Sequence, residues 1–158
     1  MQACGASVIK RLRSDSRIGN HSMTRNIRVD RMIDELGIFR TTLAVAHVAR
    51  PEERHTLSNV MVDTGSEYNW IPATVLQALE VERVRVDRFE TADGRVLERD
   101  VGFAYLFTAG RSAIAAVVFA EPRDLVLLGA HGLEGLNLRV DRGRKELVPA
   151  GPVPAAVA

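Results

Sequence analysis

The chain has 158 residues, 46% hydrophobic and 26% charged, which suits one compact globular domain and excludes a disordered or fibrous protein. Its net charge of +1 gives no one-sign field that would favour nucleic acid or an acidic membrane. The single cysteine, Cys4, excludes an intrachain disulfide and fits a reducing, cytoplasmic compartment. The histidines lack metal-ligand spacing, and no apolar run is long enough to span a membrane. We therefore expect no metal, cofactor, nucleic acid or membrane partner.

Three parts are predicted along the chain. Residues 1–30 are polar and basic without sustained periodicity, so we expect a disordered or poorly ordered leader, within which Met23 is an alternative start. Residues 31–150 carry the periodic segments and form the domain. Residues 151–158 contain Pro152 and Pro154 and are expected to be a loose tail.

The first predicted strands lead to a carboxylate. Residues 39–47 alternate in the manner of a strand, and a polar turn is expected at 51–54. Residues 57–62 then end in a continuous apolar run, which is typical of a strand buried on both faces. This strand leads directly into Asp63.

The rest of the chain is predicted to be mostly short strands. Pro72 suits the first position of a short helix, because proline needs no amide partner there. The later expected elements are a strand at 84–86, a hairpin turn at Asp93-Gly94, strands at 101–107, 112–119 and 125–128, a helix at 131–136, and a hairpin of 138–141 with 145–148. Many short strands separated by turns indicate an all-β barrel or sandwich.

The motif Asp63-Thr64-Gly65-Ser66 is the main chemical signal. These residue types are common in turns, so an ordinary turn is one interpretation. The preceding apolar strand favours another, because it places a carboxylate at the edge of a core, where an unpaired charge is costly. Glycine allows close backbone approach, and the two hydroxyls can orient a carboxylate.

A second signal is Leu127-Leu128-Gly129, about sixty residues after the Asp63 motif. Together the two motifs point to a known family. The chain resembles the retroviral-type, or retropepsin-like, aspartic proteases, in particular their single-domain bacterial relatives. The segments that carry the resemblance are Val62-Asp63-Thr64-Gly65-Ser66, Ile71-Pro72, Ala92-Asp93-Gly94-Arg95, and Leu127-Leu128-Gly129 with Leu133. It extends from Ile38 to Val148.

The resemblance implies a closed all-β barrel with one or two short helices, active as a symmetric homodimer. It implies that Asp63 is the catalytic residue and that Thr64 bonds across the two-fold axis. Gly65 would permit the tight loop, and Ser66 would hydrogen-bond the carboxylate. A hairpin flap would cover the cleft; its residues are Ala92, Asp93, Gly94 and Arg95. The residues that would brace the catalytic loop are Leu127, Leu128 and Gly129.

One Asp-Thr-Gly motif per chain means that a second copy must supply the second carboxylate. Two carboxylates about 3 Å apart share a proton, because they cannot both ionise cheaply. The ionised group would activate a water and the protonated group would polarise the scissile carbonyl. The expected function is aspartic endopeptidase, with a homodimer as the active unit and an extended peptide or protein as the substrate.

Two departures from the family pattern and two rival functions stay open. Ser66 stands where viral members usually have alanine, and Pro149, Pro152 and Pro154 lack the donors that a dimer sheet needs, so how the dimer closes is not predicted. One rival is a catalytically silent module that grips an extended peptide by strand addition. The other is a plain β-barrel interaction domain in which the Asp63 motif is only a turn.

Overall fold

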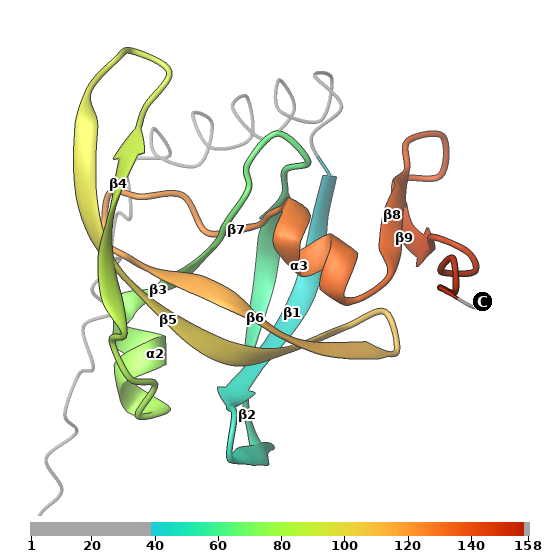
Figure 1. Cartoon of the computed structure of the whole chain (residues 1–158), viewed down its shortest axis with the longest axis horizontal. Helices are drawn as coiled ribbons and strands as arrows, with labels where there is room; N and C mark the ends of the chain where they lie inside the picture. Colours follow the sequence, from blue (N-terminus) through green and yellow to red (C-terminus); the bar gives the residue numbers. More distant parts are fainter. Residues whose placement is uncertain (1–38, 157–158) are drawn as a thin grey trace, which may run out of the picture.

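The structure, a computed structural model, describes residues 39–156, so the predicted leader at 1–30 lies outside the described residues. This part of the chain is mostly β, with two short helices (Figure 1). The elements are β1 (Phe39–His47), β2 (Arg50–Val62), β3 (Asn69–Pro72), α2 (Ala73–Ala78), β4 (Arg85–Glu90), β5 (Val96–Thr108), β6 (Arg111–Ala120), β7 (Leu127–Leu128), α3 (Ala130–Gly135), β8 (Leu138–Asp141) and β9 (Glu146–Pro149). The predicted all-β class with one or two short helices is confirmed.

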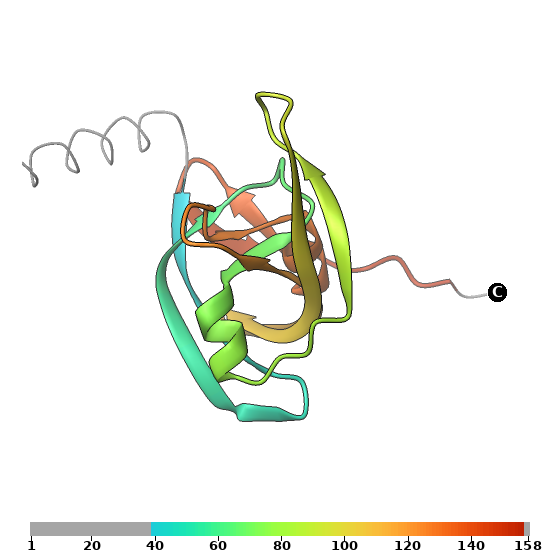
Figure 2. The ribbon, with the colours of Figure 1, turned by 90° about the vertical axis from the view of Figure 1, so that its left-hand side faces the viewer.

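Six strands close into a barrel. Neighbouring strands follow the order β1-β2-β7-β3-β6-β5, and β1 pairs with β5 to complete the ring. The pairs β2–β7 and β3–β6 are parallel, and the other ring pairs are antiparallel. Figure 2 shows the strands curving round one interior, with β1 and β2 on one side and β5 on the other. Closure leaves no free edge in the ring, which protects it from edge-to-edge association.

Aliphatic side chains fill the barrel, and aromatic side chains of β5 lie outside it. The buried core includes Leu43, Val45, Val60, Ile71, Leu76, Leu106, Val117, Leu128, Leu133 and Leu136. Phe103 is 43% exposed, while Tyr105 stacks on Phe107 with ring centroids 4.8 Å apart. A small closed barrel has little interior volume, so the inward positions of β5 take smaller residues such as Ala104.

The structure differs from the predictions at two places. The turn expected at 51–54 lies instead at Val48-Ala49, and β2 begins at Arg50. The pairing jumps by three residues between His47↔Arg50 and Ala46↔Arg54, so 51–53 form a bulge in which Pro51 needs no ladder partner. Strand β3 was not predicted, because it has only four residues and ends at Pro72, where the helix was expected to start.

The elements around the Asp63 motif gather at one end of the barrel. Figures 1 and 2 both place the tip of the β4–β5 hairpin and the loop between β2 and β3 at this end. In the C-terminal part of the chain, β8 and β9 form a separate two-stranded sheet, and residues 151–156 contain no helix or strand. Across residues 39–156 no helix has the length and apolar character needed to cross a membrane.

Candidate active site

The end of β2 fixes the backbone of Asp63. Val62 pairs with Phe39 of β1 on one side and with Leu128 of β7 on the other, so the strand is held on both edges up to its last residue. The amide of Asp63 then donates to the carbonyl of Leu128, 3.0 Å away. Asp63 itself is half-buried. A carboxylate therefore leaves the barrel wall at a defined position beside the core.

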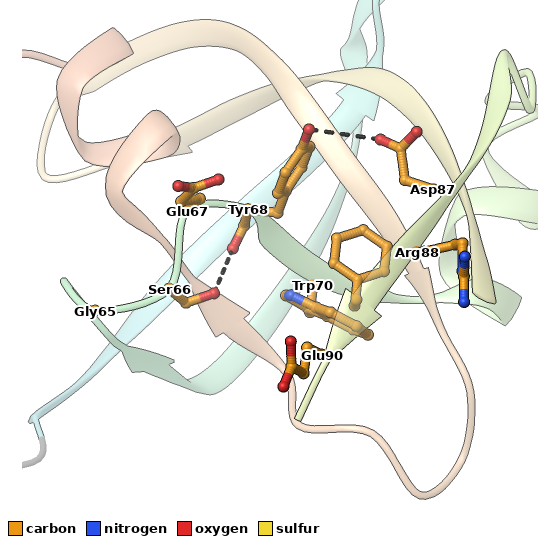
Figure 3. Close-up of a pocket in the computed structure, with 9 residues that line it drawn as sticks. Gly65, Ser66, Glu67, Tyr68, Trp70, Asp87, Arg88 and Glu90 are labelled. Atoms are coloured by element: carbon orange, nitrogen blue, oxygen red, sulfur yellow. Dashed lines mark hydrogen bonds between the residues drawn. The ribbon is translucent and has the colours of Figure 1, made fainter. Parts of the chain in front are cut away.

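The loop that follows turns back on the Asp63 side chain. The amide of Gly65 donates to Oδ1 of Asp63 at 2.9 Å, which fixes the orientation of the carboxylate. Thr64 and Gly65 are exposed. The hydroxyl of Ser66, for which a bond to the carboxylate was predicted, donates to the carbonyl of Tyr68 at 3.2 Å (Figure 3). The serine thus holds the loop, and a backbone amide contacts the carboxylate.

The segment after β7 supports this loop from below. The amide of Ala130 donates to the carbonyl of Ser66 at 2.7 Å, and the amide of His131 donates to the carbonyl of Glu67 at 3.0 Å. Gly129 lies so close to the loop that an added Cβ would contact the carbonyl of Tyr68 and lie 2.7 Å from that of Ser66. Only glycine fits such an approach. Leu128, whose carbonyl accepts from the Asp63 amide, and Gly129 therefore both contact the segment that carries Asp63.

Asn69 is a buried support residue that the sequence interpretation missed. Its side chain is fully buried, donates from Nδ2 to the carbonyl of Ala116 at 2.8 Å, and accepts at Oδ1 from the amide of Gly129 at 3.0 Å. Asn69 therefore connects β3 to β6 and to Gly129, the residue that follows β7. A polar residue inside the otherwise apolar stretch Tyr68-Asn69-Trp70-Ile71 was the available signal.

The predicted flap is a tight turn between β4 and β5. The amide of Thr91 donates to the carbonyl of Arg95 at 2.8 Å, and Gly94 closes the turn at φ +80°, where glycine is favoured. The hydroxyl of Thr91 and the guanidinium of Arg95 both donate to Asp93, and they hold the pKa of that carboxyl below its usual value. Ala92 is exposed at the same tip. The turn is internally bonded and projects from the barrel.

A cleft of about 780 Å³ joins Asp63 to the base of this hairpin. The residues that line it are Asp63, Ser66, Trp70, Thr91, Arg95, Leu97, Arg99, Glu121, Pro122, Arg123, Asp124, Leu125 and Leu127. The structure thus brings together four predicted site residues, Asp63, Ser66, Arg95 and Leu127. One wall belongs to the β4–β5 hairpin and the opposite wall to the loop between β6 and β7.

A shielded ion pair ties these two walls together. Arg99 of β5 binds both carboxylate oxygens of Asp124, at 2.7 and 3.1 Å, and the two side chains are only 13% and 9% exposed. The amide of Glu121 also donates to Asp124 at 2.8 Å. Hydrogen bonding to Arg99 lowers the pKa of Asp124, and the same contact raises the pKa of Arg99, although burial opposes both shifts. This bidentate pair fixes the base of the flap.

The lowered pKa of Asp124 predicts how stability depends on pH. A carboxyl whose folded-state pKa is depressed stabilises the fold above its unfolded pKa of about 3.9, and that stability is lost as pH falls through the folded pKa. Asp124→Asn should therefore lower the unfolding free energy by about 3 kcal/mol at pH 7. This destabilisation should become smaller as the pH falls below about 4. Urea denaturation at pH 7 and pH 3 measures both values.

Asp100→Asn is the matched control for this effect, because Asp100 follows Arg99 on β5 but pairs with Arg83, and both of those side chains are more exposed than Arg99 and Asp124. Exposed pairs contribute only about 0.5 kcal/mol, so this variant should be close to wild type at both pH values. The role given to the Arg99–Asp124 pair would be contradicted if both variants lost the same unfolding free energy at pH 7. It would also be contradicted if Asp124→Asn lost as much unfolding free energy at pH 3 as at pH 7.

The sequence matches no protein-family model and no curated protein. Chains of known structure do match, among them the solution structure of simian foamy virus (mac) protease. That match has a TM-score of 0.42 and 18% sequence identity, and it covers 60% of this chain and 91% of the viral chain. At this level of similarity, the evidence for function is the arrangement of this chain's own residues.

Proposed function

We propose that the protein is an aspartic endopeptidase that uses two Asp63 carboxylates, one from each copy of a symmetric homodimer. The observation that carries the proposal is the position of Asp63. Its backbone is fixed by β7, its carboxylate is oriented by the Gly65 amide, and it lies in a cleft whose other wall is a projecting hairpin. Strand-held carboxylates with preorganised donors suit acid–base chemistry, because little reorganisation is needed during the reaction.

The second carboxylate must come from another copy. Among the described residues that line the cleft, the other acidic groups are Glu121 and Asp124, and both are ion-paired to Arg99. Neither is free to share a proton with Asp63. The loop beside Asp63 exposes Thr64 and Gly65, so a two-fold contact through this loop would bring one Asp63 from each copy together.

The chemistry follows from two carboxylates that share one proton. The ionised Asp63 takes a proton from a bound water, and the water oxygen attacks the scissile carbonyl carbon. The protonated Asp63 gives its proton to the carbonyl oxygen, and a tetrahedral diol forms. When the diol collapses, that Asp63 takes a proton back from a diol hydroxyl, while the other Asp63 gives the proton it took from water to the leaving nitrogen. The C–N bond breaks, a carboxylic acid and an amine leave, and the pair again holds one shared proton. Thr64 then has the role of joining the two loops across the axis, and Ser66 keeps the loop closed through Tyr68.

The substrate of this site is an extended peptide. The β4–β5 hairpin, with its tip at Ala92, Asp93, Gly94 and Arg95, would lie over the peptide and exclude water from the cleft. Such a flap needs a stiff base and a compact tip. The Arg99–Asp124 pair supplies the base, and the bonds between Thr91 and Arg95 supply the tip.

Dilution tests the shared site. If each copy contributes one Asp63, specific activity towards a peptide library should fall as the enzyme is diluted through the dissociation constant of the dimer. Sedimentation velocity at the same concentrations gives the fraction of dimer, and the two curves should coincide. Constant specific activity at concentrations where only monomer sediments would overturn the shared site.

A further inference from the structure

A second cavity of about 650 Å³ adjoins the Asp63 cleft and is not used by the proposed mechanism. It lies between the loop at 65–68 and the outer strand β4 (Figure 3). Ser66 and Trp70 line both this cavity and the cleft, so the two spaces share a wall. A peptide held against Asp63 can therefore reach this cavity with a side chain. It is named here the β4 cavity.

Aromatic rings form the walls of the β4 cavity. Phe89 of β4 packs edge-to-face against Tyr68 and against Trp70, with ring centroids 5.4 and 4.9 Å apart. All three rings are half-buried and so present part of their surface to the space. Rings fixed in this way offer flat contact to the aliphatic stem of a long side chain and a negative face to a cation.

The charge of the β4 cavity is not balanced. Asp87 is neutralised by Arg85, whose Nε lies 2.9 and 3.1 Å from its two oxygens, and this contact raises the pKa of Arg85. The guanidinium of Arg88 points away from the rings in Figure 3 and lies 4.0 Å from Glu98 on the neighbouring strand.

Two carboxylates remain without a counter-charge. Within residues 39–156, the side chains of Glu67 and Glu90 make no hydrogen bond or ion pair, and both are exposed. Figure 3 shows Glu90 beside the indole of Trp70 and Glu67 beside Tyr68. The cavity therefore combines aromatic walls with two unpaired negative charges at its rim.

We propose that the β4 cavity binds a basic side chain, arginine or lysine, of the peptide substrate. The inference rests on the proposed function and names the substrate class of the same site. The long stem of such a side chain lies against Phe89, and its charged end is attracted by the carboxylates of Glu67 and Glu90 at the rim while staying partly in water. An acidic side chain would meet two like charges, and a short apolar one would gain no electrostatic attraction. The enzyme thus selects peptides with a basic residue at one fixed distance from the cleaved bond.

Matched peptides test this inference. A peptide library would identify the position of the basic residue, and arginine would then be compared with citrulline, which has the same shape without the charge. The readout is the ratio of kcat/KM for the two peptides. Wild type should prefer arginine on the order of 10-fold, the combined effect of an exposed cation–π contact and exposed ion pairs. The Glu67→Gln/Glu90→Gln double variant should lower this ratio to about 2- to 5-fold, because the ion pairs are lost while the cation–π contact with the rings stays.

Glu134→Gln is the control for net charge, because Glu134 is exposed on α3 and does not line the β4 cavity. It should keep the wild-type ratio. Equal cleavage of the arginine and citrulline peptides by wild type overturns the inference and leaves the proposed function intact. A ratio that stays at the wild-type value in the double variant, or falls equally in Glu134→Gln, also overturns it. If wild type cleaves no peptide of the library, the proposed function fails and this inference fails with it.

Discussion

Asp63→Asn should lower the rate of peptide hydrolysis by about 10³-fold or more, while the protein stays folded. Asparagine is nearly the same size as aspartate, and its carbonyl oxygen can still accept the Gly65 amide that now lies 2.9 Å from Oδ1. What it cannot do is ionise, so the dimer loses the base that activates water. Steady-state cleavage of a library peptide, with circular dichroism as the check on folding, measures both halves of this expectation.

Mixing supplies the control that separates a shared site from a site within one chain. When Asp63→Asn protein is added in excess to wild type, mixed dimers hold one aspartate and one asparagine, and total activity should fall. A wild-type rate from folded Asp63→Asn protein would place the chemistry elsewhere. Full retention of wild-type activity in the mixture, under conditions where subunits exchange, would assign the site to a single chain. A silent peptide-binding module would differ again, because neither protein would cleave.

Local sequence patterns predict three backbone segments of the site. The apolar run before Asp63 predicts a buried strand, and the Asp93-Gly94 pair predicts a tight hairpin, because both depend on residues that are neighbours in sequence. The same holds for Leu127 and Leu128, whose apolar character predicts a short buried strand. The structure has strands or turns at each of these places.

The supports of the site depend on distant residues and could not be predicted in the same way. The buried side chain of Asn69 bonds to Ala116 and Gly129, which are 47 and 60 positions away in the sequence. The Arg99–Asp124 pair joins residues 25 positions apart across the cleft. Neither pairing leaves a periodic trace in the sequence, since the closure of the barrel brings these groups together. Propensity and spacing report on neighbours, while a buried polar contact is decided by topology.

The bonding of Ser66 shows the same limit on a smaller scale. The resemblance to aspartic proteases implied a bond from its hydroxyl to the carboxylate, yet the hydroxyl donates to Tyr68 two residues away. Serine hydroxyls readily bond nearby backbone groups, and this local acceptor competes with the carboxylate. The motif therefore predicts which residue types surround Asp63 and does not fix which acceptor each donor chooses.

Gly129→Ala should damage the site through its support. The added Cβ would meet the carbonyls of Tyr68 and Ser66, so the loop that holds Asp63 must move away from β7. Forcing a methyl group into such a contact costs about 1–3 kcal/mol of unfolding free energy. Displacing a catalytic group by about 1 Å can cost on the order of 100-fold in rate, so the loss of kcat/KM should exceed what the lost stability explains.

Hydrogen exchange gives a readout of Gly129→Ala that does not depend on cleavage. The amides of Ala130 and His131 are bonded to the carbonyls of Ser66 and Glu67, so displacement of the loop should speed their exchange before global unfolding does. Gly143→Ala is the matched control, because the nearest atom to its added Cβ is Oδ1 of Asp141 at 3.4 Å, an ordinary contact. It should leave activity and the exchange of both amides at wild-type values. Gly129→Ala could also keep wild-type activity and wild-type exchange of both amides. In that case the loop would stay in place without the close approach that only glycine allows, and the position of Asp63 would not depend on the segment after β7.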